Sequence, residues 1–157
     1  MRATTKIIIV FLLLGTYYSS TAQFNITSDG SWKVSKTEFP NWKSHYYDDS
    51  AWGTSTAPSP NPGGFVPIPG TQSMWISPYE DTAFFRKSFE LRSNCLKVSM
   101  LQIDCDNEYH LYINDSLVGW GNSGLDVWVV QPFLKIGKNT IAIHAIDYNP
   151  PYALSVK

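Results

Sequence analysis

A short stretch of the sequence gathers the side-chain types that carry out acid–base catalysis and metal binding. The stretch DCDNEYHLYINDSLVG covers residues 104–119. Its carboxylates and its imidazole belong to Asp104, Asp106, Glu108, His110 and Asp115. Carboxylates at short spacing can bind calcium, and two of them across a cleft can hydrolyse a glycoside. Each chemistry demands a definite arrangement, against which the stretch can be tested.

A calcium loop of the helix–loop–helix type fits the stretch poorly. With Asp104 as the first position, acidic residues fall at positions 3, 5 and 12 of such a loop. Position 6, which needs a glycine for its sharp turn, is Tyr109. Tyr109 then alternates with Leu111 and Ile113 across polar residues, which is typical of a strand with one buried face. We expect a strand over residues 108–113.

A glycoside-cleaving pair of carboxylates is also weakly supported. Such a pair needs carboxyl groups about 5–9.5 Å apart. Asp104 and Asp106, two residues apart, can meet that spacing, but so can many pairs of surface carboxylates. A structural role fits better. Asp104, Asp106 and Asn107 are expected to cap a connection between strands, and Asp115 to lie in a hairpin turn. The sequence has no H-E-x-x-H motif and no G-x-S-x-G elbow, so we expect no catalytic site.

The elements that must position these residues are short strands separated by turns. The apolar phase along residues 96–104 slips between Met100 and Leu101, which predicts a β-bulge there. A strand of that length would hold Cys95 and Cys105 roughly 30 Å apart, too far for a disulfide between them. The expected strands cover residues 31–35, 83–91, 96–104, 108–113, 117–120, 127–130, 136–146 and 152–156. This pattern predicts an all-β protein, an antiparallel β-sandwich.

Four motifs occur in an order that is similar to a known family. The sequence DDSAW at residues 48–52 looks like D-D-S-x-W, and AFFRKSF at 83–89 looks like the strand F-R-K-x-F. Residues 104–119 resemble A-D-N-x-Y-x-L-Y-V-N-G-x-x-V-G, with Asp115 in place of the hairpin glycine, and 134–143 resemble L-K-x-G-x-N-x-I-A-I. Together they resemble the galactose-binding-domain-like jelly roll. Such modules accompany the catalytic domains of glycoside hydrolases and occur in lectin-like proteins.

The resemblance implies one candidate cofactor, a structural calcium ion held by loop carboxylates. Asp48 and Asp49 are the candidates for that weak site. The alternative for the same residues is an Asx-turn that supports Trp52. No other cofactor is expected.

Aromatic side chains in two segments are candidates for binding a carbohydrate. Aromatic rings pack under the C–H faces of sugars, and planar polar side chains bind the hydroxyl groups. Residues 120–128 and 147–152 are expected to be loops, and the resemblance implies that they lie near the same end or concave face of the fold. Their candidate ligand-binding residues are Trp120, Asn122, Asp126, Trp128, Tyr148, Asn149 and Tyr152. If Trp128 and Tyr148 bind a glycan, their alanine variants should lose binding but keep thermal stability.

The N-terminus has the composition of a secretory signal peptide. Arg2 and Lys6 precede an eight-residue apolar run, and small residues flank a cleavage site after Ala22. The run is shorter than the ~20 residues that cross a bilayer, so no membrane span is expected. We expect residues 1–22 to be a signal peptide and 23–157 to be one extracellular domain, which is truncated at its last strand if the chain is a fragment.

The composition of residues 23–157 restricts the partners. These residues hold 10 basic and 13 acidic side chains, a net charge of −3, which argues against nucleic-acid binding. Asn25 and Asn114 begin N-x-S/T sequons, which predicts glycosylation on secretion. We expect a secreted, non-catalytic, lectin-like carbohydrate-binding module whose partner is a carbohydrate or glycoprotein. Two alternatives stay open: an accessory domain of a truncated glycoside hydrolase, and an extracellular structural or adhesive glycoprotein.

Overall fold

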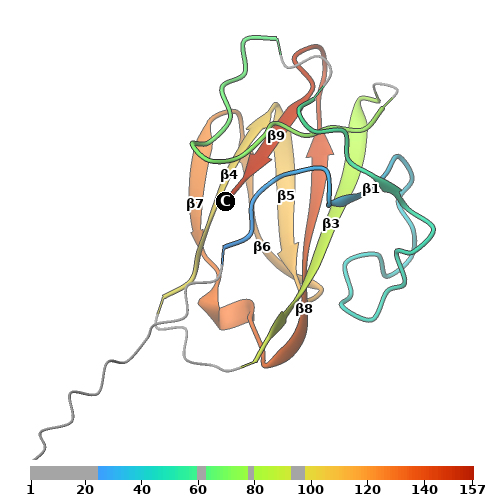
Figure 1. Ribbon diagram of the computed structural model, residues 1–157, viewed down its shortest axis with the longest axis vertical. Coiled ribbons are helices and arrows are strands. Elements are labelled where there is room, and N and C mark those ends of the chain that lie inside the picture. Colours follow the sequence, from blue (N-terminus) through green and yellow to red (C-terminus); the bar gives the residue numbers. More distant parts are fainter. Residues whose placement is uncertain (1–24, 60–62, 78–79, 93–97) are drawn as a thin grey trace, which may run out of the picture.

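The computed structural model describes residues 25–59, 63–77, 80–92 and 98–157. Over these residues the chain is an all-β sandwich of two antiparallel sheets, as predicted (Figure 1). Among them, no helix has the length and apolar character that crossing a lipid bilayer requires. The predicted signal peptide and Cys95 lie outside the described residues, whereas Cys105 is buried and carries a free thiol.

Nine strands and one short 3-10 turn, η1 (Gln131–Phe133), make up the described elements. The larger sheet holds β1 (Lys33–Ser35), β2 (Gly53–Thr54), β3 (Thr82–Leu91), β5 (Glu108–Ile113), β6 (Ser116–Asn122) and β8 (Gly137–Ile146). The smaller sheet holds β4 (Met100–Asp106), β7 (Leu125–Val129) and β9 (Ala153–Val156). Their spatial orders are β2-β1-β3-β8-β5-β6 and β7-β4-β9. Figure 1 shows the smaller sheet in front of the larger one.

Alternating apolar residues form the core between the sheets. Tyr109, Leu111 and Ile113 of β5 point inward as predicted, each at most 1% exposed. Leu101 and Ile103 of β4 face them from the smaller sheet and belong to the same cluster. Burying such side chains contributes about 1.5–3 kcal/mol each, so this alternation is the main source of stability. Two of the tryptophans assigned to the core, Trp32 and Trp75, lie in this cluster and are fully buried.

The predicted bulge in β4 is wrong. The strand begins at Met100, and from there outward and inward residues alternate without interruption. The apparent slip in the apolar pattern arises because Val98, which precedes the strand, is 63% exposed. The pairing irregularity lies instead between Leu111 and Tyr112 of β5, opposite β6.

The outer face of the larger sheet carries a second, smaller core. Residues 36–52, here called the covering segment, fold over this face beside β3 (Figure 1). Trp42 and Trp52 of the segment pack on Phe84 of β3 and Ala142 of β8. Trp52, also assigned to the core from the sequence, is therefore buried on the outer side of the sheet.

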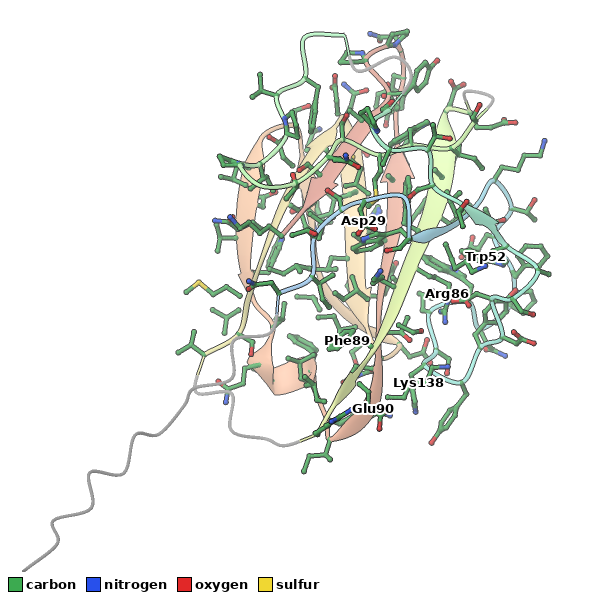
Figure 2. All side chains as sticks on the ribbon, viewed as in Figure 1. Asp29, Trp52, Arg86, Phe89, Glu90 and Lys138 are labelled. Carbon is green, nitrogen blue, oxygen red and sulfur yellow. The ribbon has the colours of Figure 1, made fainter. Side chains whose placement is uncertain are left out.

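The side chain of Arg86 holds the covering segment to β3. Its guanidinium is fully buried, and its Nε donates a 2.8 Å hydrogen bond to Asp49 Oδ2. The guanidinium also donates to the backbone carbonyls of Trp42, Ser44 and Tyr47. Its carbon atom Cζ lies 5.1 Å from the ring centroid of Tyr47. Figure 2 shows Arg86 next to Trp52, where the segment meets the sheet. A buried charge is tolerated only with such partners.

We expect Asp49→Ala to lower the free energy of unfolding by about 3 kcal/mol, because it leaves a buried guanidinium without its counter-ion. The adjacent Asp48 is the matched control. Its Oδ1 accepts a 2.9 Å bond from the Ser50 backbone in an exposed turn, so Asp48→Ala should cost less than about 1 kcal/mol. Urea unfolding of both variants measures the difference, and equal losses would contradict the assigned role of Asp49.

Candidate functional site

The strand register arranges the outer face of the larger sheet into three rows of side chains. Each row crosses β3, β8, β5 and β6 in that order. The first row is Thr82, Ile146, Glu108 and Asn122; the second is Phe84, His144, His110 and Trp120; the third is Arg86, Ala142, Tyr112 and Leu117. Residues far apart in the sequence thus become neighbours on one surface.

The first three side chains of the second row form a run of stacked rings. The ring centroids of Phe84 and His144 lie 4.6 Å apart with planes 11° from parallel, and those of His144 and His110 lie 5.7 Å apart at 20°. Burial, and then the neighbouring His110, lower the pKa of His144, which favours its neutral form. Trp120 lies directly opposite His110 and is 64% exposed. The row therefore leads from a buried ring beneath the covering segment to an exposed indole.

Tyr148, from the connection between β8 and β9, is tied to the first row. Its backbone N–H donates a 2.9 Å bond to Asn107 Oδ1, and its hydroxyl donates a 3.0 Å bond to Glu108 Oε1. That second bond is the main cause of the raised pKa of Tyr148. We call the surface formed by these neighbours the open patch, which consists of Glu108, His110, Trp120, Asn122 and Tyr148.

The segment of residues 120–128, expected to be a loop, is mostly strand. Only Ser123 and Gly124 lie between β6 and β7, which belong to different sheets. Because the chain passes from the larger sheet to the smaller one at this turn, side chains of the same parity face outward on β6 and inward on β7. Trp120 and Asn122 lie on the open patch, whereas Asp126 and Trp128 point between the sheets.

Asp126 and Trp128 form an internal network with Tyr109. The Tyr109 hydroxyl donates a 2.7 Å bond to Asp126 Oδ2 and accepts a 2.8 Å bond from Trp128 Nε1. Burial, and then the bond to Asp126, raise the pKa of Tyr109. Two glycines of β6 make room for this network. A Cβ at Gly119 would overlap the Trp128 ring, and one at Gly121 would lie 2.6 Å from Tyr109 Cε1.

Of the other two candidates, Tyr152 belongs to the core and Asn149 follows Tyr148 in the same turn. The Tyr152 ring packs against the core, 6.0 Å from the ring of Trp75. The Asn149 backbone donates a 2.9 Å bond to Asp147 Oδ1 within its own turn. The structure therefore brings together three of the seven candidates, Trp120, Asn122 and Tyr148. The sequence reasoning did not select Glu108 or His110 as binding residues, although the alternation along β5 already placed them on the face opposite the core.

Carboxylates crowd the connection between β4 and β5, next to the open patch. Burial, and then the charge of Asp106, raise the pKa of Asp104, and burial raises the pKa of Asp106. Asp106 Oδ1 accepts a 2.8 Å bond from Asn107 Nδ2, which joins two side chains and does not test the predicted capping of the backbone. Asp147 is fully buried, and its Oδ2 has no hydrogen-bond partner among the described residues. Burial, more than the nearby Asp106, raises its pKa to about 6.

Neither of the predicted metal-binding carboxylates belongs to a larger group of metal-binding side chains. Asp48 forms the Asx-turn that the sequence offered as the alternative, and Asp49 is paired with Arg86. Across the described part of the chain, no three His, Cys, Asp or Glu side chains gather closely enough to hold a metal ion. A structural calcium therefore remains a prediction that rests on the family resemblance.

The two predicted glycosylation sites differ in their surroundings. Asn25 is exposed. The Asn114 side chain lies inside a network, where its Nδ2 donates to Phe133 O at 2.9 Å and to Asn139 Oδ1 at 2.7 Å. Its Oδ1 accepts a 3.0 Å bond from the Thr140 backbone. A glycan on Nδ2 would break one of these bonds, so Asn25 is the better acceptor.

Comparisons with known proteins show where this fold occurs. No protein-family model matches the sequence, and no curated protein matches it. Solved structures do match. A β-glucuronidase of Bacteroides uniformis superposes on 83% of this chain with a TM-score of 0.58 at 19% identity, over 17% of its own length. A glycosyl hydrolase family 2 member from Bacteroides cellulosilyticus covers 84% with a TM-score of 0.57 at 16% identity, over 20% of its length.

A β-glycosidase from Bacteroides vulgatus is also similar, with a TM-score of 0.53 at 19% identity over 85% of this chain and 20% of its own. The same sandwich occurs within family 2 glycoside hydrolases. This chain spans about a fifth of the length of these enzymes. At such low identity the likeness concerns the fold of one domain.

The two tryptophans should respond differently to truncation. Trp128 is half-buried and packs against the core, so Trp128→Ala should cost about 3 kcal/mol of unfolding free energy. The exposed Trp120 should change stability by no more than about 0.5 kcal/mol when replaced by alanine. Thermal and urea unfolding measure both. This replaces the expectation from sequence that Trp128→Ala leaves stability intact, and a stable Trp128→Ala variant would restore it.

Asp147→Asn should stabilise the protein increasingly as pH rises. The carboxyl has a pKa of about 6 when folded and about 3.9 when unfolded. Between these values the folded state binds more protons, so the stability of the natural protein falls with pH, and the penalty is complete above the folded pKa. The advantage of Asp147→Asn should grow by about 2 kcal/mol from pH 4 to pH 7.

Unfolding curves at several pH values test this prediction. A pH-independent effect of Asp147→Asn would refute the buried-carboxylate explanation.

Proposed function

We propose that this chain is a non-catalytic accessory β-sandwich domain of a glycoside-hydrolase-like protein and that it binds carbohydrate. The observation that supports the first part is the likeness of most of the chain to one domain of several larger glycosidases. The four ordered motifs, which resemble galactose-binding-domain-like modules, point the same way. The apolar leader supports export, so the domain would work outside the cell.

The proposal that the domain is non-catalytic is supported by the surroundings of its carboxylates. Hydrolysis of a glycoside needs an acid and a nucleophile or base facing each other across the sugar. Glu108 receives a hydrogen bond from Tyr148 on an exposed face, and Asp126 is bound by Tyr109 between the sheets. Asp147, with its raised pKa, is fully buried. These three carboxylates thus lie in separate environments.

The carbohydrate-binding part of the proposal is supported by the open patch. An exposed indole beside a carboxylate, a carboxamide and a phenol is the combination that sugar-binding surfaces use. A free-standing lectin would share this patch. The likeness to domains of larger enzymes favours the accessory role over a free-standing lectin or an adhesive glycoprotein.

Two measurements test this proposal on the exported chain. Assays with nitrophenyl glycosides, a β-glucuronide among them, should show no turnover above the buffer rate. A glycan array should show specific binding. Turnover by the purified chain would refute the non-catalytic role, and an array without hits would refute carbohydrate binding.

The gene offers a third test. DNA beyond the codon for Lys157 should continue in frame into a catalytic domain if the accessory role is right. A stop codon after residue 157 in the natural gene would favour a free-standing lectin.

A further inference from the structure

We infer that the open patch is the glycan-binding site and that it takes an uncharged sugar ring in preference to a uronic acid. This inference rests on the proposed carbohydrate-binding function and adds to it the location of the site and the class of sugar. It is argued from the position of Trp120, the polar groups beside it and the charge around it.

Trp120 is a fixed platform. It lies within β6, whose backbone is hydrogen-bonded to β5 on one side, and it is 64% exposed. Its cross-strand neighbour His110 is held in the stack with His144, so the position opposite Trp120 on β5 carries a rigid ring. A ring placed by a sheet loses little freedom on binding, which favours affinity. The exposed indole can therefore support the C–H face of a sugar.

Polar groups lie beside the platform in the first row. Glu108 and Asn122 face each other across β5 and β6, two residues along from His110 and Trp120. Such positions are roughly 7–8 Å from the platform or closer, within reach of the hydroxyl groups of a sugar seated on it. A carboxylate offers about four acceptor positions, and the Tyr148 hydroxyl uses one of them. Glu108 can thus accept hydrogen bonds from sugar hydroxyls while it holds Tyr148.

The charge around the patch selects against anionic sugars. The first and second rows, all of whose members are described, include no lysine or arginine. Arg86, in the third row, is buried and paired with Asp49. Lys43, from the covering segment, lies over the ring of Tyr112 in the third row, with its Nζ 4.7 Å from the ring centroid. A uronate beside Glu108 would meet a like charge, and the side chains of the first two rows supply no lysine or arginine to offset it.

The acidic surroundings reach beyond Glu108. Asp106 directly precedes Asn107, whose side chain binds the Tyr148 backbone. Burial, and then the charges of Asp106 and Asp126, raise the pKa of Asp104 at the end of β4. This distinguishes the patch from a site built for a carboxylate, which would present arginine or lysine. The similar enzymes named for glucuronides therefore do not predict the ligand of this domain.

Isothermal titration of the exported chain tests the inference. The probes are neutral oligosaccharides (galactan, mannan, xylan and glucan fragments) and uronate oligosaccharides (polygalacturonate and alginate fragments). We expect at least one neutral probe to bind at least tenfold more tightly than any uronate. Trp120→Ala should weaken that binding at least tenfold. Glu108→Gln should narrow the preference for neutral over uronate probes at least threefold.

Tyr46→Ala is the matched control, because Tyr46 is an aromatic residue 84% exposed on the covering segment, outside the patch. It should bind like the natural protein. Thermal unfolding of each variant shows that it is folded, and Trp120→Phe should keep part of the affinity.

The possible outcomes separate this inference from the proposed function. If the natural protein binds none of the probes and no glycan on the array, carbohydrate binding itself is wrong. If it binds a neutral probe and Trp120→Ala binds equally well, the function stands and the location is wrong. If uronates bind as tightly as neutral probes, the location can stand and the selectivity is overturned.

Discussion

The burial of one charge, the guanidinium of Arg86, determines how the covering segment packs on the outer face of the larger sheet. A strand that carries an arginine among aromatic residues on its outward side must supply that arginine with partners or leave it in water. The covering segment supplies them: a carboxylate, three backbone carbonyls and aromatic rings. The two sequence motifs that contain Asp49 and Arg86 are thus two halves of one contact. Each motif depends on the other for its conformation.

That contact also decides which part of the sheet can meet a ligand. The covering segment occupies the face over β3 and β8, where Phe84 and Ala142 are buried beneath Trp42 and Trp52. The face over β5 and β6 stays accessible at Trp120 and Asn122. The stacked histidines lie at the border between the two parts, where His144 packs on the buried ring of Phe84.

Sequence reasoning predicted the strands and their inward faces well, because side-chain alternation is a local property. It placed Tyr109, Leu111 and Ile113 correctly, and the hairpin turn at Asn114 and Asp115 has the positive φ angles expected there. It could not predict which strands are neighbours. Without knowing that β5 lies between β8 and β6, nothing connects His144, His110 and Trp120, which are spread over 35 positions of the chain.

The reading of residues 120–128 as one loop failed for a related reason. Glycine and asparagine are typical of turns, and GNSG at 121–124 contains both. Only Ser123 and Gly124 turn, and Gly121 belongs to β6, where the ring of Tyr109 packs against it.

The glycines of β6 also determine which side chains of this strand face the solvent. With no side chain of its own at positions 119 and 121, β6 accepts Trp128 and Tyr109 in a single register. A slip by one residue would drive the bulky indole of position 120 inward and turn the glycines toward solvent. The packing of Trp128 and Tyr109 against Gly119 and Gly121 therefore fixes the register of β6, and with it the outward direction of the exposed indole at position 120.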